Sequence, residues 1–119
     1  DSDLPRAIDR ALEAAGIEAA AAWADVRTLI ESLPSLLPIE MTIGDSGATV
    51  ALLQIYLMYG SQGPARDNLL AAGPTGYYGS ITAAAVSELQ DEEDIVESGE
   101  YDNKTQLAFA DRELESLNI

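Results

Sequence analysis

The sequence of 119 residues contains no cysteine and no histidine. Without cysteine the chain cannot form disulfides, thiol nucleophiles or cysteine metal sites. Without histidine it also lacks the commonest acid–base side chain and the commonest zinc ligand. These two absences exclude thiol catalysis and remove the side chains that most often bind zinc.

Basic residues are almost as scarce. Lysine and arginine together number 6 against 21 acidic residues, the formal net charge is −15, and Lys104 is the single lysine. Such a surface repels nucleic acid and anionic membranes, because both are bound through cations. The charge is explained either by solubility or by adaptation to salty surroundings that screen self-repulsion.

Aromatic residues make up 6% of the chain, whereas hydrophobic residues of all kinds make up 47%. This composition predicts a packed core of aliphatic side chains between alanine-rich helices. No apolar run reaches the roughly 18 residues that a membrane span needs. The sequence starts at Asp1 without methionine, which is expected of an exported protein after removal of its signal peptide, or of a trimmed chain.

The pattern before residue 39 predicts a helical segment over residues 1–33, followed by a proline linker over residues 34–38. Leu4, Ile8 and Leu12 lie at helical spacing before Gly16 interrupts the pattern, and Trp23 lies on the apolar stripe of the next helical stretch; these four residues are here called the N-terminal stripe. Pro34 and Pro38 are expected to end the helix, because proline removes a backbone donor and disfavours helical geometry before it.

Residues 39–119 are expected to form an all-α module of three helices. The first helix is predicted over residues 48–59, capped by Asp45 or Ser46. It is apolar nearly all round, so we expect it either to be buried on several sides or to offer a surface to a partner, with Leu52, Ile55, Tyr56 and Tyr59 on that surface. A long loop is predicted over residues 60–75, with Leu69 and Leu70 packed back against the core.

Two shorter helices are expected after this loop. The first is capped by Ser80 or Thr82, buries Ala85, Val86 and Leu89, and ends at the acidic run that starts at Asp91. The last is capped by Asp102. Its predicted inward face consists of Leu107, Ala110, Leu114 and Leu117.

The order of these signals resembles a known family. The series is Gly44-x-x-Gly47, Val50-x-x-Leu53-Gln54-x-x-Leu57, Gly60, Gly76-Tyr77-Tyr78-Gly79-x-x-Thr82, Ala85-Val86-x-x-Leu89-Gln90, Ile95, Gly99 and Thr105. It is similar to the peptidoglycan-binding-domain-like family of small three-helix modules, over about residues 39–117. The resemblance implies a non-catalytic module with a shallow groove for cell-wall glycan or stem peptide, near Tyr77, Tyr78, Thr82 and Gln90.

The same residues allow a purely structural interpretation. A tyrosine has an apolar face and a hydroxyl that suit a sugar ring or a peptide, and glutamine both donates and accepts hydrogen bonds. Alternatively, Tyr77 or Tyr78 fills the core, because most aromatic residues in turns beside a helix are packing residues. Gln90 would then hold the adjacent loop in place.

Catalysis, metals and cofactors are not expected. Seven acidic residues crowd residues 91–102, but no pattern indicates the desolvated pocket that would raise the pKa of one carboxyl for glycoside hydrolysis. The EF-hand pattern is absent. The abundance of carboxylates is then the one feature of this segment that would suit calcium. Gly76-x-x-Gly79 is too short for a phosphate-binding loop and lacks its lysine.

Two functions therefore follow as hypotheses. The first is an exported binding module for the cell wall or a related surface polymer, with an extracellular or cell-surface location. The second is a self-assembling subunit of an extracellular filament or surface layer, because a contact between copies that does not close produces a polymer. Its interface would join the N-terminal stripe to the first module helix.

Overall fold

The computed structural model describes residues 10, 13, 26–37, 40–112 and 114. Helices and irregular segments alone make up this part of the chain, which confirms the all-α class. Besides the helices it contains two isolated bridges, Met41 with Tyr101 and Ser46 with Tyr77. The helices are α2 (Val26–Leu36), α3 (Ala48–Gly60), α4 (Pro64–Ala72), α5 (Ser80–Glu92) and α6 (Asn103–Ala110).

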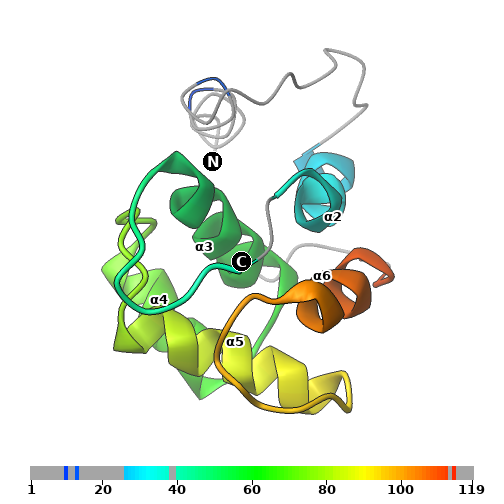
Figure 1. The fold of residues 1–119 in the computed structure, drawn as a ribbon. Helices are drawn as coiled ribbons and strands as arrows, with labels where there is room; N and C mark the ends of the chain where they lie inside the picture. Colours follow the sequence, from blue (N-terminus) through cyan, green and yellow to red (C-terminus); the bar gives the residue numbers. More distant parts are fainter. Residues whose placement is uncertain (1–9, 11–12, 14–25, 38–39, 113, 115–119) are drawn as a thin grey trace.

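Helix α3 lies at the centre of the fold, between α2 on one side and the α4–α5 pair on the other (Figure 1). Its residues are buried on every side, among them Leu52, Ile55 and Tyr56, which are 0%, 3% and 0% exposed. Tyr59 is half-buried and packs against the same core. The apolar side chains of α3 are therefore covered by other described residues of the same chain and do not form an exposed surface.

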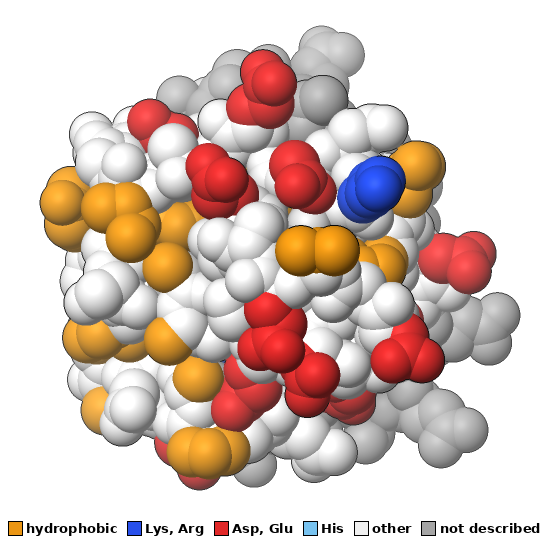
Figure 2. Space-filling model, turned by 60° about the horizontal axis from the view of Figure 1, so that its bottom comes forward, with side chains coloured by type: hydrophobic (Ala, Val, Ile, Leu, Met, Phe, Trp, Pro, Cys, Tyr) orange, Lys and Arg blue, Asp and Glu red, His pale blue; other side chains and the backbone are white. Residues whose placement is uncertain are grey.

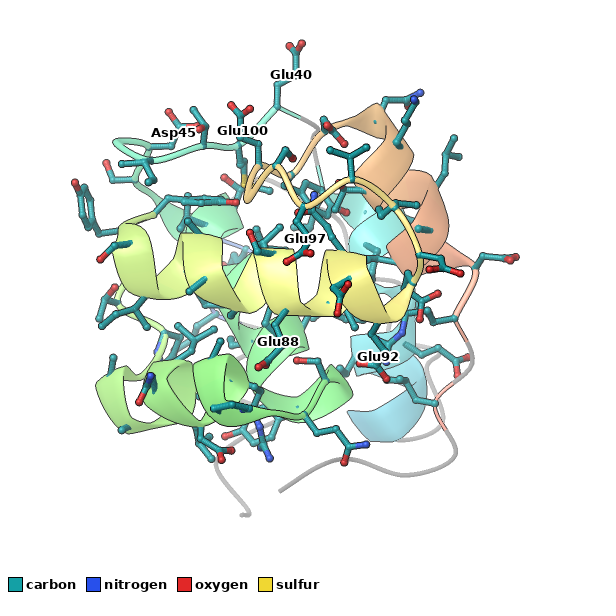
Figure 3. All side chains as sticks on the ribbon, turned by 90° about the horizontal axis from the view of Figure 1, so that it is seen from below. Glu40, Asp45, Glu88, Glu92, Glu97 and Glu100 are labelled. Carbon is teal, nitrogen blue, oxygen red and sulfur yellow. The ribbon has the colours of Figure 1, made fainter. Side chains whose placement is uncertain are left out.

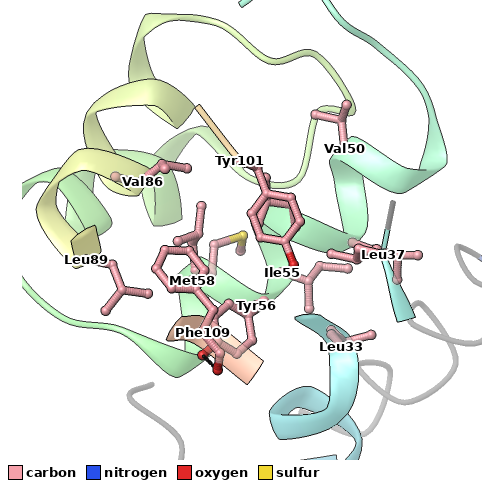
Figure 4. Packing of buried hydrophobic residues seen from close by; sticks show 14 of the residues in the cluster. Leu33, Leu37, Val50, Ile55, Tyr56, Met58, Val86, Leu89, Tyr101 and Phe109 are labelled. Atoms are coloured by element: carbon pink, nitrogen blue, oxygen red, sulfur yellow. Dashed lines mark hydrogen bonds between the residues drawn. The ribbon is translucent and has the colours of Figure 1, made fainter. Parts of the chain in front are cut away.

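The core continues from α3 to α6 through stacked aromatic rings (Figure 4). The ring of Phe109 lies 5.9 Å from that of Tyr56 and 6.0 Å from that of Tyr101, measured between centroids. Leu33 and Leu37 close the core from the side of α2. A few large rings thus fill the space between α3 and α6.

The predicted linker over residues 34–38 is wrong in its first half. Helix α2 continues through Pro34 to Leu36, and Ile30, Leu33 and Leu37 are buried. A proline within a helix costs a backbone hydrogen bond. Here the surroundings use the carbonyl of Pro34, which accepts from the Tyr101 hydroxyl at 2.9 Å and from Nε2 of Gln106 at 3.0 Å. Pro38 lies outside the described residues.

The long loop predicted over residues 60–75 is also wrong, because it contains α4. Pro64 occupies the first turn of this helix, where its missing N–H costs nothing. Leu69 is buried and Leu70 packs against the core, as expected. The helix is short and its sequence is only weakly amphipathic, so it was not recognised from periodicity.

The predicted helix starts are partly correct. Asp102 caps α6, accepting from the Thr105 N–H at 2.9 Å. Glycines precede the other two module helices: Gly47 stands at the start of α3 and Gly79 at the start of α5, and neither helix has a side-chain cap. Asp45 instead accepts from the N–H of Thr42, which closes the preceding turn.

The inward face of α6 differs from the prediction. Leu107 is 62% exposed and Ala110 is exposed, whereas Thr105 and Phe109 point into the core. Leu114 is buried, but it follows the end of the helix; Leu117 lies outside the described residues. The buried face of α5 is as predicted, with Ala85, Val86 and Leu89.

Candidate functional site

The turn in front of α5 is held by one buried glutamine, Gln54 of α3. Its amide nitrogen donates to the Thr82 hydroxyl and to the Tyr77 carbonyl, both at 2.9 Å. Its amide oxygen accepts from the N–H of Gly76 at 2.9 Å. Gly76 has a φ of 80°, a conformation that glycine adopts without strain. Residues 75–82, here called the first turn unit, are thereby fixed to the central helix.

A second unit repeats this arrangement in front of α6. Gln90 of α5 donates to the Thr105 hydroxyl at 2.7 Å and to the Glu100 carbonyl at 3.1 Å. It accepts from the N–H of Gly99, whose φ is 73°. Residues 98–105, the second turn unit, therefore match the first position by position, with the same Gly, Tyr and Thr spacing.

A segment over residues 40–47, which contains one turn at residues 42–45, joins the two turn units. Met41 pairs with Tyr101 through hydrogen bonds in both directions, and the Gly44 N–H donates to the Tyr78 carbonyl at 2.9 Å. The Gly47 N–H donates to the Gly76 carbonyl at 2.8 Å. These short antiparallel contacts keep both turns on one side of the fold and fix the entrance to α5.

A partly open pocket of about 300 Å³ lies beside the first turn unit, between the end of α4 and the start of α5. Its lining is apolar on the walls, with Gln54 and Thr82 at the buried polar end and hydroxyls of Thr75 and Ser80 at exposed positions. The full lining, here called the Tyr77 pocket, is Gln54, Leu69, Ala72, Gly73, Thr75, Tyr77, Gly79, Ser80, Ile81 and Thr82. Concave, mostly apolar sites with a few polar groups are typical of ligand pockets.

The structure separates the residues predicted for ligand binding. Tyr77 is 55% exposed and lines the pocket, and Thr82 lines it from a buried position. Tyr78 and Gln90 are both fully buried and bonded within the fold, so neither is offered to a ligand. Tyr78 and Gln90 are therefore structural residues, as the second interpretation of the sequence predicts, and Tyr77 lies at the surface.

Three features of the pocket were missed from the sequence: Gln54, Ile81 and the α4 wall with Leu69 and Ala72. A repeat in the sequence could have indicated the role of Gln54. The pattern Gly-x-Tyr-x-x-x-Thr follows Gln54 and occurs again after Gln90. Ile81, 44% exposed, had no such signal, since an apolar residue near a helix start usually packs inward.

Burial raises the pKa of the Tyr78 and Tyr101 phenols well above the ordinary tyrosine value, and it raises that of Tyr56 in the same direction. All three hydroxyls are hydrogen-bonded inside the fold: Tyr56 donates to the Phe109 carbonyl, Tyr78 to the Gly99 carbonyl and Tyr101 to the Pro34 carbonyl. These tyrosines are neutral structural groups.

Acidic side chains are widespread on the face shown in Figure 2. Red side chains spread over its middle, and hydrophobic side chains are most numerous toward the left edge, the side on which α5 begins, with others in the middle and at the right. Glu92, Glu97 and Glu100 belong to this acidic face (Figure 3). Among the described residues, no group of three or more acidic side chains is arranged to hold a metal ion.

Asp102 has a structural task as the cap of α6. The Thr105 N–H that it accepts holds the pKa of its carboxyl below the usual range. The remaining residues predicted for an assembly interface, Leu4, Ile8, Leu12 and Trp23, lie outside the described residues. None of the helices described is long and apolar enough to cross a membrane.

Comparison with known protein families gives one match, to the model described as "Putative peptidoglycan binding domain", over residues 46–108. This range spans more than half of the chain and contains both turn units and every residue that lines the Tyr77 pocket. No curated protein and no solved structure matches the chain significantly.

Proposed function

The chain belongs to the peptidoglycan-binding domain family, and on this premise we propose that it binds peptidoglycan through the Tyr77 pocket without cleaving it. The observation that carries the proposal is the pocket itself. It opens beside a half-exposed aromatic ring, and all its lining residues lie within the segment that matches the family. A family of this kind implies association with the cell wall, and we propose that the protein is exported to reach it.

Binding without catalysis is supported by the chemistry of the lining. Glycoside hydrolysis uses two carboxyl groups that flank the scissile bond. Among the described residues the Tyr77 pocket is lined by neutral side chains alone. The carboxyl groups nearest to the lining in sequence belong to Asp67 and Glu88. Asp67 forms an ion pair with Arg66, and Glu88 accepts from the backbone N–H groups of Ala65 and Arg66 at the start of α4.

The second hypothesis, a self-assembling subunit, loses one of its two supports. The apolar surface of α3 that suggested an interface is covered within the chain, with Leu52 and Tyr56 fully buried. Its other support, the N-terminal stripe, lies outside the described residues. Self-assembly therefore stays a prediction, and peptidoglycan binding is the function that the site favours.

Sedimentation with insoluble peptidoglycan tests the proposal. The full chain should pellet with the polymer, and a variant carrying Tyr77→Ala and Ile81→Ser should remain largely in the supernatant. Leu107→Ser is the matched control, because Leu107 is an equally exposed apolar residue on α6, outside the pocket. The supernatant should contain no released sugars or peptides beyond those of the polymer alone.

Two results would contradict the proposal. The first is a full chain that stays in the supernatant at every concentration of polymer. The second is a pocket variant that pellets as well as the Leu107→Ser control while its circular dichroism remains helical. Release of soluble fragments by the pure protein would contradict the non-catalytic part alone.

A further inference from the structure

The second turn unit provides an internal reference for the first. The two units share the residues that build the turn: the latching glutamine, the glycine with positive φ, the buried tyrosine and the buried threonine. They differ at exposed or partly exposed positions, where the first unit has Tyr77, Gly79 and Ile81 and the second has Glu100, Asp102 and Lys104. The fold therefore does not require apolar residues at these positions.

Tyr77, Gly79 and Ile81, which are replaced by charged residues in the second unit, all line the Tyr77 pocket. Gly79 also lets the aromatic ring lie close to the backbone, because a Cβ at this position would come within 3.0 Å of Cε2 of Tyr77. The corresponding positions of the second unit are polar, and Asp102 there caps its helix. The first turn unit thus carries aromatic and apolar side chains at the positions that line the Tyr77 pocket, and the second turn unit carries polar side chains at the same positions.

The lining suits a ring that is partly apolar and partly hydroxylated. The half-exposed Tyr77 provides an aromatic face, and Ile81 and Leu69 provide aliphatic walls. Hydroxyl groups of Thr75 and Ser80 lie at exposed positions of the same lining. A sugar ring presents C–H groups on its faces and hydroxyls at its edge, which is the complementary pattern.

Charge distinguishes the two components of peptidoglycan. The stem peptide carries carboxylates, whereas an N-acetylglucosamine unit of the glycan is uncharged. The pocket lining offers no basic side chain among the described residues, and the whole chain carries a formal charge of −15. A carboxylate entering the pocket would lose hydration without gaining an ion pair, which is costly.

We infer that the Tyr77 pocket receives an uncharged N-acetylated sugar ring of the glycan strand, not the stem peptide. The inference rests on the proposed peptidoglycan binding and specifies which part of the polymer is recognised. Tyr77 provides the surface on which the ring lies, and Ile81 and Leu69 enclose its edge. The acidic face over residues 91–102 then keeps anionic parts of the wall at a distance.

The experiment compares two probes on the full chain by amide NMR. One probe is a tetramer of N-acetylglucosamine, which has no peptide, and the other is a synthetic stem peptide, which has no sugar. The tetramer should shift amide resonances of residues 75–82 and leave those of 98–105 unchanged, so the second turn unit serves as an internal control. The tetramer should also displace the protein from insoluble peptidoglycan, and the stem peptide should do neither.

A double substitution sharpens the test. Tyr77→Glu with Ile81→Lys places in the first unit the residues that the second unit already carries at the equivalent positions, so the fold should tolerate it. Affinity for the tetramer should fall about 10-fold, which is the upper end of the effect of losing one aromatic contact. Leu107→Lys, which changes an exposed residue outside the pocket, should leave the affinity unchanged.

The outcomes separate this inference from the proposed function. If the full chain pellets with peptidoglycan while the stem peptide, and not the tetramer, perturbs residues 75–82, the inference is wrong and peptidoglycan binding stands. Equal shifts in both turn units on addition of the tetramer would also overturn it. Failure to pellet with peptidoglycan at all would overturn the proposed function, and the inference with it.

Discussion

The hydroxyl of Tyr78 donates a hydrogen bond to the carbonyl oxygen of Gly99, which fastens the first turn unit directly to the second. Both residues are buried. The bond crosses between two turns that are each latched by their own glutamine, so the loops in front of α5 and α6 form one connected polar layer. Tyr77 directly precedes the bonded tyrosine, so this bond helps to fix Tyr78 on the buried side of the turn while Tyr77 lies at the surface.

Tyr78→Phe should destabilise the fold by about 1–3 kcal/mol, because it leaves the buried carbonyl of Gly99 without its partner. Urea unfolding followed by circular dichroism measures this change. Tyr77→Phe is the control and should alter the free energy of unfolding by less than about 0.5 kcal/mol, since its ring is half-exposed. Equal stability of the two variants would show that the bond contributes nothing.

Gln54→Ala and Gln90→Ala should each lower the free energy of unfolding by about 1–3 kcal/mol, because each removes the acceptor of a turn N–H and the donor to a buried threonine hydroxyl. Their effects on function should differ. Gln54→Ala releases the turn that carries Tyr77 and should weaken sedimentation with peptidoglycan. Gln90→Ala acts on the second unit and should leave sedimentation intact below its unfolding temperature; equal losses of binding would contradict the assignment of the pocket.

Leu52→Ala should cost about 2–5 kcal/mol, as expected when a fully buried leucine leaves a cavity. Its mass by light scattering should not change, because this side chain packs within the chain. Leu107→Ala, at a 62% exposed position, should stay within about 0.5 kcal/mol of the unmodified protein. If Leu52→Ala reduced the size of an assembly and left stability unchanged, Leu52 would be an interface residue after all.

Glu88→Ala should destabilise α4 by about 0.5–2 kcal/mol, the usual effect of removing a helix N-cap. Both oxygens of the carboxylate accept from N–H groups at the start of that helix, at 3.0 Å each, so α5 caps α4 across the gap between them (Figure 3). Hydrogen exchange of the α4 amides measures the effect. Glu92→Ala, at an exposed position of α5, should leave their exchange unchanged.

Stability should fall in alkaline solution because Tyr56, Tyr78 and Tyr101 have pKa values raised by burial. Below about pH 10 both the folded and unfolded chains keep these protons, and the contribution is fully present. Above that pH the unfolded chain ionises first, and the free energy of unfolding should drop by up to about 1.4 kcal/mol per pH unit and tyrosine. Urea unfolding at several pH values measures the slope. Tyr101→Phe should show a shallower fall, and a flat profile between about pH 9 and 11 would contradict the argument.

Several parts of the fold follow from local sequence. The helices α3, α5 and α6 were predicted from periodic apolar residues, and Asp102 was recognised as a cap because a short acceptor side chain before a helix satisfies its free N–H groups. The family resemblance depended on the spacing of glycines and apolar residues, and the match over residues 46–108 confirms it. Helix α4 is not predicted by periodicity because it is short and has few apolar residues at helical spacing.

Other parts depend on contacts between distant residues. Tyr77 and Tyr78 are adjacent and chemically identical, so no local rule decides that the first is half-exposed and the second is buried. That choice is made by the pairing with segment 40–47 and by the carbonyl of Gly99. In the same way, the carbonyl of Pro34 in the last turn of α2 accepts hydrogen bonds from Tyr101 and Gln106, which lie about 70 residues away in the sequence.

The sequence by itself determined the all-α class, the strong negative charge and the family, because composition, period and spacing are local properties that survive without knowledge of contacts. The tertiary structure alone decided which residues form the candidate site. Gln54 latches the first turn, α4 supplies a wall, and the burial of Tyr78 and Gln90 leaves Tyr77 and Ile81 at the rim. Exposure is a property of the packed chain, since each side chain is covered by residues that the sequence places far away.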